Sequence, residues 1–232
     1  MTARYAIYYA PAQGDDLLRT AAAWLGRDAY DGRLQPRPAA ARLPGLDLDA
    51  LTADPRGYGF HATLKAPFEL TEGATEDELL DFARAFAASR EAFEARLAPA
   101  ALGRFLALRL EAPTPKMNEL AEACVKAFDP FRAPLSDFDL ARRRKAPLTP
   151  KQDARLVEWG YPYVFEDFRF HMTLTNSIAD EAVRGQVLEV LQGLFPAQTH
   201  RFDAVAVFKQ DTRNAPFHVI ARPAFAGASV SP

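Results

Sequence analysis

Two segments of the chain place a histidine and a threonine two residues apart in nearly the same setting. One reads Phe-His-Ala-Thr-Leu around His61 and Thr63, and the other reads Phe-His-Met-Thr-Leu around His171 and Thr173. On a β-strand, side chains two residues apart point to the same face. Each segment is therefore predicted to bury an apolar face and to present an imidazole beside a hydroxyl. Two such strands held side by side would form a cleft with two imidazoles and two hydroxyls.

That set of groups suits acid–base chemistry on a phosphate ester. Opening a cyclic phosphodiester needs a base that deprotonates the attacking water. It also needs an acid, on the opposite side of the phosphorus, that protonates the leaving oxygen. Imidazole titrates near pH 6.5, so His61 and His171 can each start in either state. The hydroxyls of Thr63 and Thr173 would hold the non-bridging oxygens. The sequence leaves open which histidine is the base, because the answer depends on which ester bond breaks.

Two more cations share these strands by the same alternation. Lys65 follows Thr63 by two residues, so we expect it to add a fixed positive charge to the cleft, the alternative being a solvated edge residue. Arg169 precedes His171 by two residues and is a candidate to bind substrate. The chain shows no spacing typical of a zinc or two-metal site, so we expect no metal and no cofactor.

Two further candidates lie outside the motifs. Arg143 stands for the dense basic run Arg142–Lys145, which is either a solvated segment or a flap that grips a second phosphate through the forked guanidinium. Tyr5 lies on the first expected strand, where it could offer a phenol to the cleft or pack in the core.

The composition restricts the partners. The formal net charge of −2 over 232 residues gives no global attraction to polyanions, so long nucleic acid is disfavoured and a small phosphorylated sugar or nucleotide is favoured. Cys124 is the only cysteine, which excludes an intrachain disulfide and fits a reducing compartment. We recognise no signal peptide and no membrane span in the sequence and therefore expect a cytoplasmic protein without membrane contact. The oligomeric state is left open.

The order of the expected elements looks duplicated. Each half contains a histidine strand, then a helix, then two strand-like stretches. The predicted class is α+β: one bilobal domain over 1–232, with pseudo-repeat halves of roughly 1–112 and 113–232. We expect two pseudo-symmetric antiparallel sheets, helices on their outer faces and a central cleft. The expected strands are 3–10, the two histidine segments, 96–101, 105–110, 200–208 and 217–221, and the expected helices are 15–25, 75–86, 114–128, 149–159 and 180–195.

The paired motifs resemble those of the 2H phosphoesterase superfamily, which includes cyclic nucleotide phosphodiesterases and RNA ligase-like cyclic phosphodiesterases. The wording RYAIYYAP, YGFHATLKAPF and FRFHMTLTNSI is similar to the subgroup encoded beside bacterial phosphonate-degradation genes. This resemblance implies catalytic roles for the four motif residues named above. The positions two further on, Lys65 and Thr175, differ between the two motifs.

The expected function is a metal-independent cyclic phosphodiesterase for a small sugar or nucleotide phosphate. The resemblance implies a ribose cyclic phosphate with a further phosphate, of the kind formed in carbon–phosphorus lyase degradation of phosphonates. One alternative is processing of 2′,3′-cyclic phosphate ends on RNA or nucleotides. Another is a non-catalytic protein that binds a phosphorylated ligand.

Overall fold

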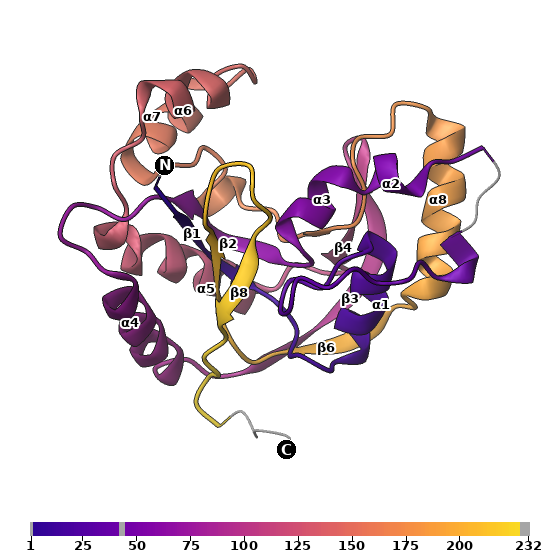
Figure 1. Ribbon diagram of the computed structural model, residues 1–232, viewed down its shortest axis with the longest axis horizontal. Helices are drawn as coiled ribbons and strands as arrows, with labels where there is room; N and C mark the ends of the chain where they lie inside the picture. The colour runs from indigo at the N-terminus through magenta and orange to yellow at the C-terminus, as the bar shows by residue number, and fades with distance from the viewer. Residues whose placement is uncertain (1, 42–44, 228–232) are drawn as a thin grey trace.

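One antiparallel sheet of eight strands runs through the molecule in the order β6-β3-β4-β5-β2-β1-β7-β8 (Figure 1). The computed structural model describes residues 2–41 and 45–227. The two histidine strands, β2 and β5, are neighbours at the centre of the sheet and pair through Ala62 and Met172. The strands are β1 (Arg4–Tyr9), β2 (Ala62–Phe68), β3 (Phe93–Leu102), β4 (Phe105–Leu110), β5 (Met172–Thr173), β6 (Gln198–Phe202), β7 (Ala206–Gln210) and β8 (His218–Ala221).

The α+β class with antiparallel pairing is confirmed, but the two expected sheets are joined into one. The join is narrow, because β5 is only two residues long. On one side of it lie β2, β1, β7 and β8, and on the other lie β5, β4, β3 and β6. Each side therefore takes strands from both halves of the chain, and the sheet has no boundary near residue 112.

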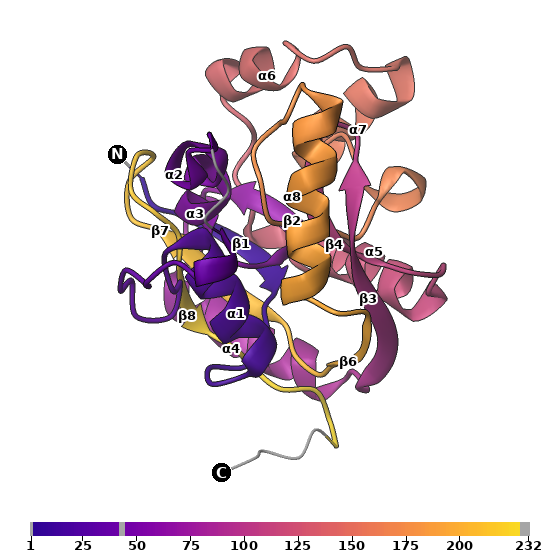
Figure 2. The ribbon, with the colours of Figure 1, turned by 90° about the vertical axis from the view of Figure 1, so that its right-hand side faces the viewer.

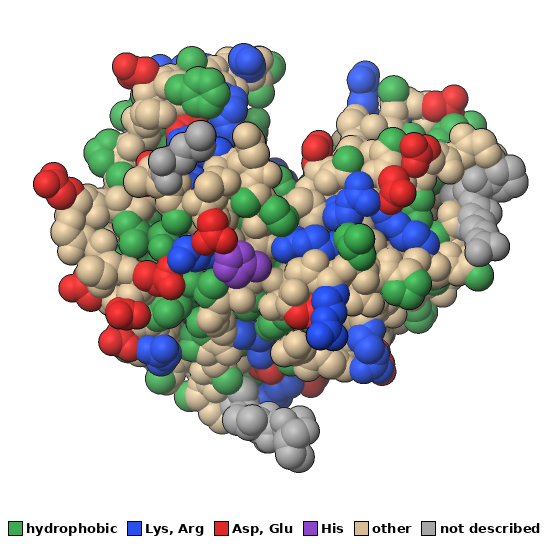
Figure 3. All heavy atoms as spheres, viewed as in Figure 1, with side chains coloured by type: hydrophobic (Ala, Val, Ile, Leu, Met, Phe, Trp, Pro, Cys, Tyr) green, Lys and Arg blue, Asp and Glu red, His purple; other side chains and the backbone are tan. Residues whose placement is uncertain are grey.

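Helices flank both sides of the sheet and leave a hollow between them. Figure 1 shows α4 and α5 beside β1 and β2, while Figure 2 shows α8 in front of β3 and β4. The helices α6 and α7 form an arm that faces α2 and α3 across the hollow, which the space-filling view shows as a notch (Figure 3). The helices are α1 (Asp16–Leu25), α2 (Leu48–Leu51), α3 (Ala53–Tyr58), α4 (Glu76–Ala88), α5 (Pro115–Ala127), α6 (Asp137–Arg143), α7 (Pro150–Trp159) and α8 (Glu181–Leu194), with 3-10 turns at Ala39–Ala41, Asp129–Phe131 and Phe165–Asp167.

The helix ends follow the capping residues of the sequence. The side chain of Asp15 accepts a hydrogen bond from the backbone of Leu17 at the start of α1, and Gly26 ends that helix with a φ of 82°. Reciprocal capping boxes begin α4 at Thr75 and α7 at Thr149. These predicted boundaries are confirmed.

The two faces of β1 pack against different cores. Tyr5, Ile7 and Tyr9 belong to the main core, which also contains the buried faces of α1, α4 and α5. Ala6 and Tyr8 belong to a smaller cluster on the opposite face. Because side chains alternate along a strand, the face of β1 that carries Ala6 and Tyr8 is the one directed toward the cleft.

The predicted strand 200–208 is wrong as a single element. Its first part is in β6, which pairs with β3, and its last part is in β7, which pairs with β1 on the other side of the sheet. The linking residue Asp203 is anchored by the backbone of Phe225 and by an ion pair with Arg222. The strand-like pattern of 200–208 does not reveal such a crossing, since both parts are strands of the same sheet.

Candidate active site

The register of β2 and β5 assembles the four motif residues on one face. Since Ala62 pairs with Met172 in antiparallel sense, His61 stands opposite Thr173 and His171 stands opposite Thr63. Residues directly opposite one another have Cβ atoms about 4.5–5.5 Å apart, and diagonal neighbours are about 7–8 Å apart. The imidazoles therefore occupy one diagonal of a four-cornered patch, and the hydroxyls occupy the other.

Both imidazoles are held in the same way. The Nδ1 atom of His61 lies 2.8 Å from the carbonyl oxygen of Gly59, and Nδ1 of His171 lies 2.6 Å from that of Arg169. A carbonyl only accepts, so Nδ1–H is the donor in each ring and Nε2 carries the lone pair of the neutral form. The Nε2 atom of each ring is thus the one available to a substrate, and that of His61 lies 3.4 Å from Oγ1 of Thr63.

Position 59 requires glycine. Its φ of 79° lies in the left-handed region, and a Cβ on it would come within 2.4 Å of Cβ of Ala29. Glycine therefore allows the chain to enter β2 with its carbonyl directed at His61.

His61 rests on an aromatic floor. Its ring stacks on Tyr8 with centroids 3.8 Å apart, and Tyr58 and Phe208 lie at 6.0 and 5.8 Å. Removal from water lowers the pKa of His61 to about 4; the bond to Gly59 opposes that shift, and the charge of His171 adds to it. The ring is therefore neutral at neutral pH until an anion binds.

His171 has a different neighbour. Phe105 of β4 lies 5.5 Å from its ring centre. Burial lowers the pKa of His171, the hydrogen bond to the backbone of Arg169 raises it, and the positive charge of Arg109 lowers it further. A bound phosphate would favour the protonated form of either ring.

An arginine pocket opens from the patch toward α6. This hollow of about 280 Å³ contains His61, Thr63 and Thr173 in its wall. Of the described residues, three arginines and no carboxylate line it, so it is suited to an anion. The remaining lining residues are Arg4, Tyr8, Tyr58, Ala66, Pro67, Arg142, Arg143 and Tyr161.

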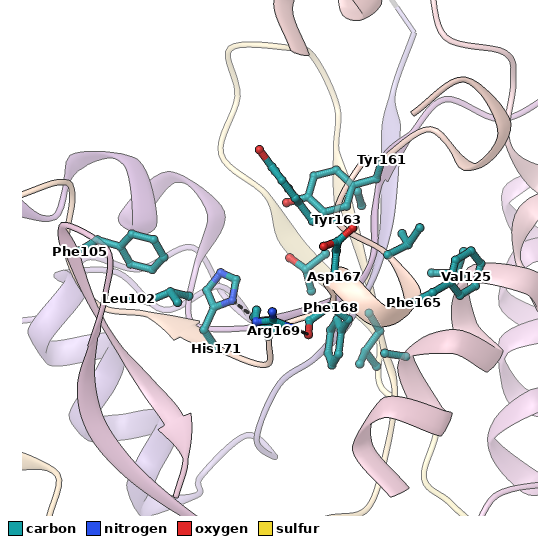
Figure 4. A pocket seen from close by; sticks show the side chains of 15 residues that line it. Leu102, Phe105, Val125, Tyr161, Tyr163, Phe165, Asp167, Phe168, Arg169 and His171 are labelled. Carbon is teal, nitrogen blue, oxygen red and sulfur yellow. Dashed lines mark hydrogen bonds between the residues drawn. The ribbon is translucent and has the colours of Figure 1, made fainter. Parts of the chain in front are cut away.

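An aromatic pocket of about 360 Å³ opens on the side of His171 (Figure 4). Thr63 and Tyr161 line both this pocket and the arginine pocket, so the two pockets adjoin one another. In Figure 4, His171, Leu102 and Phe105 lie on one side, and Tyr163, Phe165 and Phe168 lie on the other.

A third hollow of about 270 Å³ adjoins His61 and Thr173 near the start of α3. Thr175 lines it, yet the Thr175 hydroxyl accepts a hydrogen bond from the backbone of Leu106 at 2.9 Å. Thr175 therefore ties the second motif to β4.

Lys65 does not lie on the cleft face, contrary to the prediction. Tyr8 of β1 pairs with Thr63 of β2. The residue before Tyr8, however, pairs with Lys65, so Leu64 is an extra residue and forms a β-bulge. The bulge reverses the alternation after Thr63 and turns Lys65 toward α5.

The ammonium group of Lys65 forms hydrogen bonds within the protein. Nζ donates to the carbonyl of Val125 at 2.9 Å and to Oδ1 of Asp129 at 2.9 Å. Burial lowers the pKa of Lys65, and the bond to Asp129 opposes that shift. The charge is thus compensated inside the lobe.

Tyr5 also faces away from the cleft. It lies in the main core, and its hydroxyl donates to Oε2 of Glu76 at 2.7 Å. Burial and the bond to Glu76 raise the pKa of this phenol. The expectation that it reaches the cleft is wrong, and Tyr8 supplies the aromatic ring there.

Arg143 and Arg169 lie in different pockets. Arg143 lines the arginine pocket, together with the first motif, as the second-phosphate hypothesis requires. Arg169 lines the aromatic pocket beside His171, but its guanidinium donates to the carbonyls of Glu166 and Phe168. Arg169 therefore shapes the rim of that pocket and, through its own carbonyl, orients His171.

Sequence reasoning missed Arg4 and Tyr161. Arg4 shares the cleft face of β1 with Tyr8, so the same alternation could have found it. Tyr161 follows α7 in an irregular segment and carries no local signal. The two histidines outside the motifs are remote from the cleft, with His200 bonded to Tyr9 and His218 near Asp211.

The described ranges, 2–41 and 45–227, contain no helix of the length and apolarity that a bilayer crossing demands. They also contain no group of three or more His, Cys, Asp or Glu side chains placed to hold a metal ion.

Comparison with known proteins places the chain in a family. A family profile described as "Protein of unknown function (DUF1045)" matches residues 63–218. The chain belongs to the DUF1045 family. This DUF1045 chain is 40% identical over 233 residues to "Ribose 1,5-bisphosphate phosphokinase PhnN" of Janthinobacterium sp. (strain Marseille) and 35% identical over 220 residues to the protein of the same name in Laribacter hongkongensis. The matches cover 97% and 93% of the chain but 51% and 50% of those relatives, so the chain spans about half their length.

The fold has a counterpart among solved structures. E. coli LigT in complex with 3′-AMP superposes with a TM-score of 0.50 at 13% identity, over 97% of this chain and 99% of that one. The DUF1045 chain thus has the predicted fold of the 2H phosphoesterases.

Proposed function

We propose that this chain is a cyclic phosphodiesterase that opens a phosphorylated ribose cyclic phosphate by histidine acid–base catalysis without a metal. The observation that carries the proposal is the patch on β2 and β5, where His61 faces Thr173 and His171 faces Thr63. A phosphate above its centre would have an imidazole on each side and a hydroxyl beside each imidazole.

The chemical step needs only these groups and water. One neutral imidazole takes a proton from water at Nε2 while the water oxygen bonds to phosphorus. On the opposite side, the bond from phosphorus to a ring oxygen of the cyclic ester breaks, and that oxygen receives the proton on Nε2 of the other imidazolium. Thr63 and Thr173 donate to the non-bridging oxygens, and the net reaction adds one water.

The arginine pocket and the named relatives support a ribose with two phosphates. Three arginines beside the patch can neutralise a second phosphate. The longer relatives are named for ribose 1,5-bisphosphate. Opening a 5-phosphorylated ribose 1,2-cyclic phosphate at the bond to O2 yields that compound. The product of this reaction would therefore be the compound in the name of the relatives, of which this chain matches about half.

The aromatic pocket favours a second candidate function. Its rings lie beside His171 and would stack on a nucleobase, as opening a nucleoside or RNA 2′,3′-cyclic phosphate would require. A non-catalytic phosphate-binding protein is the third candidate. It has less support, because binding alone needs no pair of equivalent imidazoles.

Phosphorus NMR on three substrates in the presence of EDTA tests these candidates. The substrates are 5-phosphoribose 1,2-cyclic phosphate, a mononucleoside 2′,3′-cyclic phosphate and an oligonucleotide with a cyclic end. We expect the first to be opened fastest, and the position of the new phosphate monoester identifies the bond that broke. Preference for the nucleoside or the oligonucleotide would support the second candidate, and no turnover of any substrate would contradict an enzyme of this class.

A further inference from the structure

The arginine pocket contains a guanidinium that makes no hydrogen bond among the described residues. The Nε atom of Arg143 is buried and has no hydrogen-bond partner within 2–41 and 45–227. Its guanidinium lies over the ring of Tyr161, with Cζ 5.0 Å from the ring centre, which orients the group without using its N–H donors. The charged guanidinium is thus held in the pocket wall, and an anion that accepts from its Nη groups would form charge-assisted hydrogen bonds.

The other arginines around Arg143 have partners in the protein. Arg4 donates through Nε and Nη2 to the side chain of Gln210. Arg142 donates to Oδ1 of Asp139 at 3.2 Å. Among the residues that the structure describes, the pocket therefore combines two arginines held by hydrogen bonds with one, Arg143, whose guanidinium makes none.

The wall that carries Arg143 is fixed to the body of the protein. Arg213 donates to both carboxylate oxygens of Asp139 on α6, at 2.9 and 2.7 Å, and to Glu69 at 2.8 Å. This ion-pair cluster connects α6 to the ends of β2 and β7. The pocket is thus formed before any ligand arrives, which lowers the ordering cost of binding.

We propose that Arg143, with Arg4 and Arg142, forms the subsite for the second phosphate, a dianionic monoester on the ribose, and that Arg143 selects substrates carrying it. This inference rests on the proposed function, since the cyclic phosphate must occupy the His-Thr patch at the same time. A monoester fits better than the singly charged diester of an oligonucleotide, because three cations and no carboxylate face the pocket. Lysine would replace Arg143 only in part, since the planar fork both lies over Tyr161 and can reach two phosphate oxygens.

Paired substrates isolate this subsite. We would measure kcat/KM for 5-phosphoribose 1,2-cyclic phosphate and for ribose 1,2-cyclic phosphate, which lacks the second phosphate. Charge-assisted hydrogen bonds contribute about 1.5–3 kcal/mol, so Arg143→Gln should lower kcat/KM for the phosphorylated substrate by about 10- to 100-fold. The same variant should lower kcat/KM for the other substrate by a much smaller factor, since that substrate leaves the subsite empty. Arg143→Lys should recover only part of the loss.

Arg144 provides the matched control. It follows Arg143 at the end of α6, points to an ion pair with Asp153 and does not line the pocket. Arg144→Gln should therefore change neither kcat/KM. Equal losses on both substrates in Arg143→Gln would overturn the subsite while leaving the phosphodiesterase standing.

A binding measurement keeps the inference testable without turnover. Ribose 5-phosphate carries the monoester alone, and calorimetry should show that the wild type binds it and that Arg143→Gln binds it at least about 10-fold more weakly. Equal affinity in the two proteins would refute the subsite. If neither cyclic substrate is hydrolysed, the proposed function fails, and calorimetry still decides whether Arg143 binds a phosphate.

Discussion

The two histidine motifs repeat one another in sequence but not in their surroundings. His61 lies on the ring of Tyr8 beside the arginine pocket, whereas His171 lies near Phe105 beside the aromatic pocket. The motif itself supplies the imidazole, the hydroxyl and the backbone carbonyl that orients the ring. The neighbouring strands, β1 on one side and β4 on the other, make the two halves of the cleft unequal, together with α6 and the segment after α7.

The position two residues beyond each threonine shows the same division. Lys65 turns inward at a bulge and pairs with Asp129, while Thr175 binds the backbone of β4. Both residues join their motif to its own lobe. Within the motifs, the chemically equivalent residues thus line the cleft, and the residues that differ contact the rest of the protein.

Removing either imidazole should give the largest effect. His61→Ala and His171→Ala should each lower kcat by about 10²- to 10⁴-fold, because general acid and general base catalysis each contribute on that scale. Steady-state kinetics on the preferred substrate measures the loss, and circular dichroism verifies the fold. His218→Ala, which removes a histidine outside the cleft, is the control and should keep the wild-type rate. If one motif variant kept most of its activity, the two motifs would not be chemical partners.

Lys65→Met tests the structural role of the first motif's final residue. The substitution removes both hydrogen bonds of Nζ, while Asp129 keeps its ion pair with Arg132, so urea unfolding should show a loss of about 1–3 kcal/mol. Thr175→Val leaves one buried backbone N–H without an acceptor and should cost about 1–3 kcal/mol. Activity per folded molecule should change little in either variant. If Lys65→Met lost substrate affinity but kept its stability, the result would support a substrate-binding role for Lys65 in the cleft.

The depressed pKa of His61 predicts a pH-dependent stability. The folded-state pKa of about 4 lies below the unfolded value, so below pH 6.5 the unfolded chain binds a proton that the folded chain does not. The free energy of unfolding should therefore fall as the pH drops from about 6.5 to about 4, by about 2–3 kcal/mol for this residue. His171 and His200 are lowered too and add to the slope.

The contribution of His61 to this pH dependence is obtained by comparing the wild type with a variant that lacks the imidazole. Urea unfolding of the wild type and of His61→Gln across this pH range should give a shallower slope for the variant. Proton NMR of the imidazole C2–H should show His61 titrating well below its usual range. Identical slopes, or an ordinary titration of His61, would show that the ring is not desolvated. A depressed pKa for both motif rings also places the maximum of the bell-shaped kcat/KM profile on the acid side of neutrality.

Period-two alternation was enough to place the four motif residues on one face, and capping residues were enough to bound α1, α4 and α7. Both signals are local. The bulge at Leu64 could not be predicted from the sequence, because it is defined by the pairing of β2 with β1. The predicted position of Lys65 on the cleft face was wrong for that reason. The crossing at Asp203 and the arrival of Tyr161 in the cleft likewise depend on contacts between distant segments.

The account depends most directly on both imidazoles reaching one phosphorus atom from opposite sides. A crystal structure of the wild-type protein with orthovanadate, which adopts the five-coordinate geometry of in-line displacement, tests this. We expect Nε2 of His61 and Nε2 of His171 to lie within hydrogen-bond distance of the two apical oxygens, and Thr63 and Thr173 to contact equatorial oxygens. Vanadate bound by one imidazole alone, or outside the patch between β2 and β5, would contradict the mechanism.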